Sequence, residues 1–424
     1  MTAEVAILNK TAVALATDSA VSISTPQGVK TYNTDKLFML SKRWPVGVMV
    51  YGTASFLGIP WETVIKGFRN SLDSRSCSQT QDYARMFLKY LMETKSIFSE
   101  ALQEHDALQS LGVRYSQIES QARERVRNRR RKNEKISIQE ALQLVIDEQL
   151  KKWISSDDLP ENPRGFSENV RRKYAKRITE ICKQAFESYN LEQSYLEKLF
   201  ELAILYVSKN RFEVGYSGIV VAGFGQEEIF PSVVEYLVDG MILDNLKFTK
   251  RRENVITHKM TASIMPFAQG DAVHSFVEGS DPAYLYFAER YMLEWLENYH
   301  QVLLDISSEE EKQSLATRLS EIRDQILLKA KKDLSDYRQW KHVQPLLDSV
   351  GGLPKDELAV LAEALVYLTS LKRRFSLDLE TVGGPIDVAV ISKGDGFVWV
   401  KRKHYFKPEL NPQYFSVKYS MRHG

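Results

Sequence analysis

Short apolar runs separated by polar turns fill the first part of the chain, up to Phe56. Runs of this length are typical of β-strands, and two runs joined by turn-prone residues such as Asn9 and Lys10 are typical of a hairpin. The pattern predicts strands over residues 5–8, 11–16, 37–40 and 46–51, and the last strand ends at Gly52.

After Gly52 the apolar positions recur every three or four residues, which is the spacing of an amphipathic helix. This predicts one helix from about Thr53 and a second over residues 83–91. The next hundred residues are rich in Arg, Lys, Glu and Gln, with helical spacing over 136–153 and 174–207.

Strand-like runs return after residue 215 and are followed by further helical periodicity. We predict strands over residues 219–222, 232–238, 260–265, 386–391 and 397–401. We predict helices over residues 272–304, 309–334 and 358–371. Strands and helices thus occur in separate blocks, which indicates an α+β fold built of layers.

The composition of the chain mainly excludes certain classes of partner and site. The chain has 424 residues, 57 basic and 55 acidic, so its net charge of +2 points to neither nucleic acid nor membrane as a partner. Cys77 and Cys182 are far apart, which indicates no disulfide framework or zinc site. No apolar run approaches the ~18 residues of a transmembrane helix, and no signal peptide is evident. We expect a cytoplasmic protein.

A basic run covers residues 122–135. It is either a patch for an acidic partner or a solvated helix face, and its interleaved glutamates favour the solvated face. Nucleic-acid binding is therefore not expected. Histidines at metal-binding spacing and phosphate-binding motifs are both missing from the sequence, so we expect neither a metal nor a cofactor.

Thr2 is the first candidate for chemistry. Removal of Met1, which is usual before a small residue, would make Thr2 a free N-terminus. The threonine hydroxyl is then a nucleophile, and the α-amine, with a pKa of roughly 7.7–8.0 in model compounds, can act as its base.

Four further features occur in order along the chain. Asp18 lies in the segment ALATDSAVS, Lys36 in TDKL and Gly52 in YGTAS, and a segment near the C-terminus reads VGGPIDVAVISKGDGFVWV. Together with Thr2 they resemble the motifs of proteasome β-subunits of bacterial type, which are N-terminal-nucleophile hydrolases. The spacing from Asp18 to Lys36 is about two residues longer than in that family.

The resemblance implies a four-layer αββα sandwich with two helical insertions. The sandwich would comprise residues 2–100, 213–300 and 355–405. Residues 101–212 would form a helical insertion and residues 301–354 a helical extension. Residues 406–424 would form a C-terminal tail.

The resemblance also implies roles for individual residues. Thr2 would attack the carbonyl carbon, Lys36 and Asp18 would support it, and the N–H of Gly52 would bind the oxyanion. By alignment, a small apolar specificity pocket would be lined by Val21, Thr34, Val50 and Ala54, so cleavage after hydrophobic residues is expected.

The sequence departs from the family around the α-amine. The serine expected in the turn at residues 268–271 is missing, and the serine expected before the final Gly-Gly falls on Val382. Replacement hydrogen bonds are expected from Gln269, Asp271, Glu380 or Thr381.

The resulting prediction is a proteasome-like threonine peptidase that cleaves peptide or protein substrates and assembles as a homo-oligomer. The resemblance also implies a separate ATP-dependent unfoldase as a partner. Two alternatives stay open. One is a non-catalytic proteasome-like scaffold subunit, which the missing serine favours. The other is an amidohydrolase acting on a small amide.

Overall fold

The computed structural model describes residues 2–25, 28–376, 382–404, 406–413 and 416. The chain divides into two compact units. The first contains Met1–Leu37, Ile229–Ser232 and Val255–Gly424. The second contains Phe38–Glu228 and Val233–Asn254.

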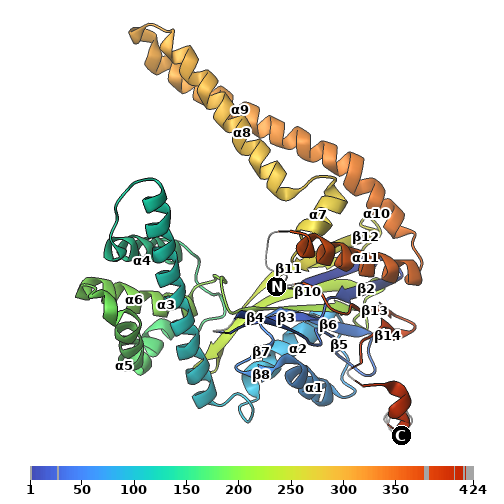
Figure 1. Cartoon of the computed structure of the whole chain (residues 1–424). Coiled ribbons are helices and arrows are strands. Elements are labelled where there is room, and N and C mark those ends of the chain that lie inside the picture. The colour runs from blue at the N-terminus through green and yellow to red at the C-terminus, as the bar shows by residue number, and fades with distance from the viewer. Residues whose placement is uncertain (1, 26–27, 377–381, 405, 414–415, 417–424) are drawn as a thin grey trace. The chain divides into compact units, whose positions relative to one another are not determined.

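A five-stranded antiparallel sheet forms the centre of the first unit (Figure 1). Its order is β12 (Ala262–Ala268), β1 (Ala3–Asn9), β2 (Ala12–Thr17), β13 (Asp387–Ser392) and β14 (Gly396–Lys401). The side-chain oxygen of Asn9 accepts hydrogen bonds from the N–H of Thr11 at 2.9 Å and of Ala12 at 3.2 Å, which closes the β1–β2 turn. The hairpin predicted at Asn9 and Lys10 is confirmed, and the strands predicted over residues 386–391 and 397–401 pair as a second hairpin, β13–β14.

Two helices pack against this sheet, α10 (Gln344–Gly351) and α11 (Lys355–Arg374), and α7 (Asp271–Glu278) packs on α11 and adds Val273 to the same apolar core. The apolar stripe of α11, with Leu358 and Leu365, meets Val5, Ile7 and Val388 in one core. All seven residues of β1 are buried. The apolar spacing of residues 358–371 therefore predicted this helix correctly.

The single helix predicted over residues 272–304 is wrong. The chain breaks after α7 at Gly279, whose φ of +70° favours glycine, and restarts at Pro282. Asp281 accepts a hydrogen bond from the N–H of Ala283 at 2.8 Å and so caps α8 (Pro282–Asp305).

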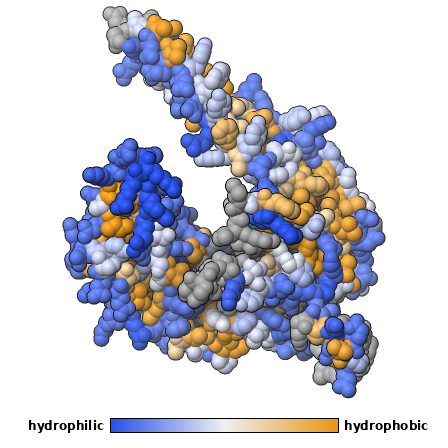
Figure 2. All heavy atoms as spheres, in the orientation of Figure 1, coloured by the Kyte–Doolittle hydropathy of each residue, from blue (hydrophilic) through white to orange (hydrophobic). Residues whose placement is uncertain are grey.

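α8 packs on α9 (Glu309–Arg338) as a helical hairpin, and a π-helical turn, η2 (Gln339–Val343), connects α9 to α10. Figure 2 shows orange and pale residues along the surface of this hairpin.

A hairpin of β3 (Ala20–Thr25) and β4 (Gly28–Asn33) lies between Asp18 and Lys36. The sequence analysis missed it because Ser, Thr and Lys alternate with few apolar residues there.

The second unit contains the strands β10 (Ser232–Ile242), β9 (Ser217–Gly223) and β6 (Val46–Gly52), in a sheet with β11 (Asn245–Val255) and β5 (Leu37–Met39) at its edges. Helices α1 (Trp61–Leu72) and α2 (Thr80–Glu93) share an apolar core with it through Phe68, Phe87 and Val48. β11 was not predicted, because most of its residues are polar or charged.

The helix predicted from Thr53 begins only at Trp61. Residues 55–60 instead form the short strands β7 (Ser55–Phe56) and β8 (Ile59–Pro60). Leu57 and Gly58 between them have positive φ values of 48° and 76°, which a helix cannot accommodate.

Four helices follow: α3 (Glu100–Arg131), α4 (Ile138–Ile154), α5 (Phe166–Phe186) and α6 (Gln193–Ser208). They enclose an apolar core around Tyr115, Trp153 and Leu202. The single helical run predicted over 174–207 is wrong, because the short 3₁₀ turn η1 (Glu187–Tyr189) and Asn190, with φ of 45°, separate α5 from α6.

The basic run at residues 122–135 lies mostly on α3 and is largely exposed. Arg123 pairs with Glu119 at 2.8 Å and Arg125 with Glu148 at 2.9 Å, and Arg129 pairs with Glu134. These ion pairs agree with a solvated helix face.

Both units thus combine antiparallel sheets with helices, and the predicted α+β class is confirmed. The stacking of layers into an αββα sandwich stays a prediction. No helix in the described part of the chain is long and apolar enough to cross a membrane.

Candidate active site

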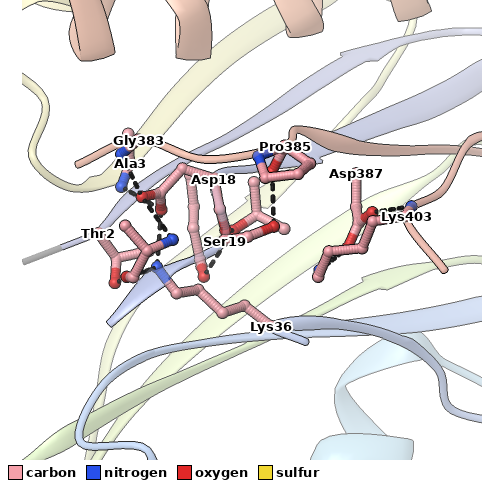
Figure 3. Close-up of polar contacts among 12 residues, drawn as sticks. Thr2, Ala3, Asp18, Ser19, Lys36, Gly383, Pro385, Asp387 and Lys403 are labelled. Atoms are coloured by element: carbon pink, nitrogen blue, oxygen red, sulfur yellow. Dashed lines mark hydrogen bonds and ion pairs between the residues drawn. The ribbon is translucent and has the colours of Figure 1, made fainter. Parts of the chain in front are cut away.

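Three of the predicted catalytic residues lie together in the first unit (Figure 3). The ammonium of Lys36 is 3.0 Å from the Thr2 hydroxyl oxygen and 2.7 Å from Oδ1 of Asp18. It also donates to the carbonyl of Ala20 at 2.7 Å, so each of its three protons has an acceptor. This geometry places a cation against the candidate nucleophile.

Strand pairing brings Asp18 next to Thr2. In the β1–β2 register Glu4 lies opposite Thr17, and one step further the N–H of Asp18 donates to the carbonyl of Ala3 at 3.0 Å. The N–H of Ala3 donates back to the carboxylate of Asp18 at 3.1 Å. The end of the hairpin therefore sets the position of the acid relative to the threonine.

The β3–β4 hairpin brings Lys36 back to the same place. Its first residue, Ala20, lies opposite its last, Asn33, and the N–H of Thr34 donates to the carbonyl of Ser19 at 2.9 Å. The chain between Asp18 and Lys36 thus returns to its starting point.

The group is buried: Thr2 and Lys36 are 4% exposed and Asp18 is 0% exposed. Besides Lys36 and Ala3, the carboxylate of Asp18 accepts from the N–H groups of Gly383 at 3.0 Å and Ala20 at 3.3 Å. A buried charge is stable only when it is paired and hydrogen-bonded, and this carboxylate satisfies both conditions.

Gly52 and its neighbours belong to the second unit. Gly52 has a φ of +91°, and a Cβ there would lie 2.3 Å from the carbonyl oxygen of Tyr216, so only glycine fits. Val50 is 5% exposed within the apolar core of this unit, and Ala54 is exposed. Val21 on β3 and Thr34 are half-buried members of the first unit.

The predicted hydrogen bonds around the amine are only partly described. The N–H of Gln269 donates to the carbonyl of Thr2 at 3.0 Å. Asp271 pairs with Lys372 at 3.1 Å and Arg373 at 3.4 Å on α11. Burial works to raise the pKa of Asp271, but these two cations outweigh it and lower that pKa.

The remaining two predicted residues of this network, Glu380 and Thr381, lie outside the described residues, as does Met1.

Sequence reasoning missed one buried acid beside the group. Glu4 is 0% exposed and accepts a hydrogen bond from the hydroxyl of Thr17 at 3.3 Å. Glu4 lies on β1, two residues after Thr2. The available signal was a single charge within the apolar run AEVAILN. The contributions of Ala20 and Gly383 are made by backbone atoms and leave no signal in residue type.

A second buried charge cluster, also missed, lies in the second unit. Asp239 on β10 pairs with Arg114 on α3 at 2.7 Å and with Lys247 on β11 at 3.2 Å. Burial lowers the pKa of Lys247 to about 8, and the charge of Asp239 opposes that shift only in part. These residues line a cavity of about 270 Å³, whose wall also includes Thr53 and Ser217.

Among the described residues, no group of three or more His, Cys, Asp or Glu side chains could hold a metal ion.

Comparison with known proteins gives little. No protein-family model matches the sequence, and no curated protein matches it. An Anbu (Gly-1) mutant from Hyphomicrobium sp. strain MC1 aligns with 100% of this chain and 96% of its own, at 9% identity and a TM-score of 0.27. Anbu from Yersinia bercovieri, described as an ancestral beta-subunit, aligns over 99% and 96%, at 9% identity and a TM-score of 0.26. At these TM-scores the likeness does not establish a shared fold, so any functional conclusion depends on the site itself.

Proposed function

We propose that this protein is a proteasome-like hydrolase that cleaves peptide bonds with Thr2 as its N-terminal nucleophile, after removal of Met1. One observation carries the proposal: the buried contact of the Thr2 hydroxyl with the Lys36 ammonium, which is itself paired with Asp18. A buried ion pair often contributes no more to stability than apolar residues of similar volume would, so stability alone does not account for a lysine held against a threonine hydroxyl.

In the proposed reaction the Thr2 oxygen attacks the scissile carbonyl, and its proton passes to the free α-amine. Lys36 stabilises the negative charge that develops on the threonine oxygen, and Asp18 holds Lys36 in position. The N–H of Gly52 is the proposed oxyanion donor. The amine returns the proton to the leaving amino group, and the acyl ester on Thr2 is then hydrolysed by a water that the same amine deprotonates.

The substrate class we propose is a peptide or protein cleaved after a hydrophobic residue. Val21, Thr34, Val50 and Ala54, all small or apolar, are the proposed specificity residues. A fluorogenic peptide panel tests this point, because preference for an acidic or basic residue at the cleavage position would contradict it. Action in the cytoplasm as a homo-oligomer, with a separate unfoldase, belongs to the same proposal.

The nucleophile can be tested on the intact protein by mass spectrometry with a peptide epoxyketone, which reacts with both the hydroxyl and the α-amine of an N-terminal threonine. We expect a mass that lacks Met1 and a stoichiometric adduct. Thr2→Ala should abolish the adduct. Thr2→Ser should retain it, and Thr11→Ala, an exposed threonine of the same hairpin, should leave it unchanged.

If the mass shows that Met1 is retained, the protein is produced as a fusion whose cleavage releases a chain beginning with Thr2. If that chain is folded and still forms no adduct and cleaves no amide, the proposal is wrong.

One observation favours a non-catalytic subunit as the second candidate. Asp271, predicted to serve the α-amine, is bound to Lys372 and Arg373. A chain beginning with Thr2 that stays unreactive in the experiment above would select this candidate.

A further inference from the structure

α8 carries a row of large apolar side chains that no described residue covers. They recur at intervals of three or four residues, which places them on one face of the helix. We call this row the aromatic stripe: Tyr284, Phe287, Tyr291, Trp295, Tyr299, Val302 and Ile306. Each member is between 57% and 77% exposed.

The stripe is separate from the face that α8 turns to α9. Ion pairs between Glu289 and Lys331 at 2.9 Å, and between Glu297 and Arg323 at 3.5 Å, mark the contact of the two helices. Glu289 is two residues from both Phe287 and Tyr291, which puts it about 200° around the helix from each. α8 therefore has a second apolar face after packing on α9.

Four of the five rings of the stripe stack in two pairs. Phe287 and Tyr291 stack with centroids 6.0 Å apart and planes at 16°, and Trp295 and Tyr299 stack at 6.3 Å and 15°. The stripe is an apolar surface about 33 Å long, since 22 residues separate Tyr284 from Ile306 at about 1.5 Å each. Ordered aromatic side chains lose little entropy on binding and are frequent anchors of interfaces.

We propose that the aromatic stripe is a self-association surface on which α8 of a second copy packs in antiparallel orientation, with Trp295 at the two-fold axis. The stripe is nearly symmetric about Trp295. In this arrangement Tyr284 meets Ile306 of the second copy and Tyr291 meets Tyr299. Large side chains at one end of the stripe then lie against smaller ones at the other, which a parallel pair would not achieve. A two-fold interface of this kind uses one patch twice.

The area is sufficient for a stable pair. A large aromatic side chain buries about 150–250 Å², so five rings that are about 60% exposed offer about 450–750 Å² per copy. Two copies together bury about 900–1,500 Å² before Val302 and Ile306 are counted. Stable interfaces bury about 1,200–2,000 Å².

Charge argues for a second copy over a lipid surface. α8 contains the acidic residues Glu289, Glu294, Glu297 and Asp305 but only one arginine, Arg290. Anionic headgroups attract basic segments and would repel this helix. The proposal does not rest on the hydrolase activity, because no residue of the stripe is part of the Thr2 group.

Sedimentation equilibrium of the full chain tests the surface. We expect the wild type to form dimers or multiples of dimers. Trp295→Glu should raise the dissociation constant of the dimer at least tenfold. Tyr286→Glu is the matched control, because Tyr286 is 64% exposed on the same helix but lies off the stripe. Equal mass for wild type and Trp295→Glu, or equal loss in both variants, would overturn the proposal.

Cysteine cross-linking tests the orientation. The native Cys77 and Cys182 are buried, so an introduced cysteine reports on its own position. Trp295→Cys should form a disulfide-linked dimer under mild oxidation, and Tyr286→Cys should not. The pair Tyr284→Cys/Ile306→Cys should link more readily than Tyr284→Cys alone. Efficient linking of Tyr284→Cys alone would indicate parallel helices and contradict the proposed orientation.

The same variants also test two other possible ligands of the aromatic stripe. If the wild type is monomeric and binds phosphatidylcholine–phosphatidylglycerol vesicles through Trp295, the stripe is a lipid surface and the proposal fails. If the wild type is monomeric and Trp295→Glu changes only the binding of a different protein, the proposal also fails.

Discussion

At the scale of single residues, Lys36 connects the parts of the candidate site. Its ammonium contacts a hydroxyl, a carboxylate and a carbonyl, and almost none of it reaches solvent. Sequestering a charge of this kind is unfavourable unless every contact is made. Substitutions of Lys36 and Asp18 should therefore separate its chemical role from its structural role.

Lys36→Met keeps the length of the side chain and removes its charge. We expect the rate of adduct formation at Thr2 to fall by about 10²–10³, the range found when a group that stabilises transition-state charge is lost. The rate is measured by time-resolved intact mass. Lys30→Met, at an exposed lysine on β4, is the control. A rate within threefold of the wild type in Lys36→Met would remove Lys36 from the mechanism.

Asp18→Asn leaves the Lys36 ammonium buried without its counter-charge. The expected loss in the free energy of unfolding is about 3–5 kcal/mol, as for other broken buried ion pairs. The double variant Asp18→Asn/Lys36→Met should recover part of this loss, because it removes the unpaired charge. Urea unfolding measures both. Strictly additive losses would mean that the two residues do not interact.

Gly52→Ala combines a positive φ with a clash against the backbone of Tyr216. Gly58 also has a positive φ, of 76°, but has open space where a Cβ would lie, so Gly58→Ala reports the backbone strain alone. We expect about 1–2 kcal/mol of destabilisation for Gly58→Ala and at least about 2 kcal/mol more for Gly52→Ala. Thermal or urea unfolding measures both, and equal losses would refute the clash.

At the scale of elements, several connections between helices and strands determine where the neighbouring elements lie. The β3–β4 hairpin returns the chain from Asp18 to Lys36, and the Gly279 break separates α7, which packs near the sheet, from α8, which bears the aromatic stripe. In the second unit, buried charges connect α3 to β10 and β11. That last connection makes stability depend on pH.

Lys247 on β11 has a pKa of about 8 in the folded protein, below its ordinary value of 10.5. Between these two values the unfolded chain binds more protons than the folded one. The free energy of unfolding should therefore rise with pH across this window, and the unfavourable effect of burying the ammonium is complete below pH 8.

Between pH 8 and 10.5 the free energy of unfolding of the wild type, relative to that of Lys247→Met, should rise by on the order of 3 kcal/mol. Urea unfolding at a series of pH values measures the difference, in which the titration of other groups cancels. Lys250→Met, at a more exposed lysine of the same strand, is the matched control. A flat difference for Lys247→Met would mean that Lys247 keeps its ordinary pKa.

At the scale of the whole molecule, each unit is assembled from segments that are distant in sequence. The first unit takes the N-terminal 37 residues and most of the C-terminal half, and the second takes most of the middle. The predicted catalytic residues are divided in the same way, with Thr2, Asp18 and Lys36 in the first unit and Gly52 in the second. The net charge of +2 provides little long-range repulsion between copies.

Self-association through an apolar stripe in a nearly neutral molecule should depend little on salt. We expect the dissociation constant of the dimer to change less than about threefold between 0.1 and 0.5 M NaCl, because screening acts on exposed charges and not on apolar contact. Sedimentation equilibrium at both salt concentrations measures this. A loss of affinity of tenfold or more would show that charges, and not the aromatic stripe, hold the copies together.

Local sequence was sufficient for elements whose apolar period matches their burial. The predictions were correct for β1, β2, β6, α2 and α11. The three strands are short apolar runs that the core buries almost completely, and the apolar residues of the two helices recur every three or four positions. Thr2, Asp18 and Lys36 were selected together from their motifs, and the Lys36 ammonium does lie within hydrogen-bonding distance of both the Thr2 hydroxyl and the Asp18 carboxylate.

Tertiary structure determined the features that the local hydrophobic period does not predict. The strands of the β3–β4 hairpin and β11 are polar, yet pairing with neighbouring strands makes them sheet. Gly279 divides a run whose hydrophobic period continues without interruption. The donors to Asp18 include backbone N–H groups of Ala20 and Gly383, one of them 365 residues away. Periodicity reports which face of an element is apolar. Contacts between distant segments depend on how the chain returns on itself, and backbone groups are the same at every residue.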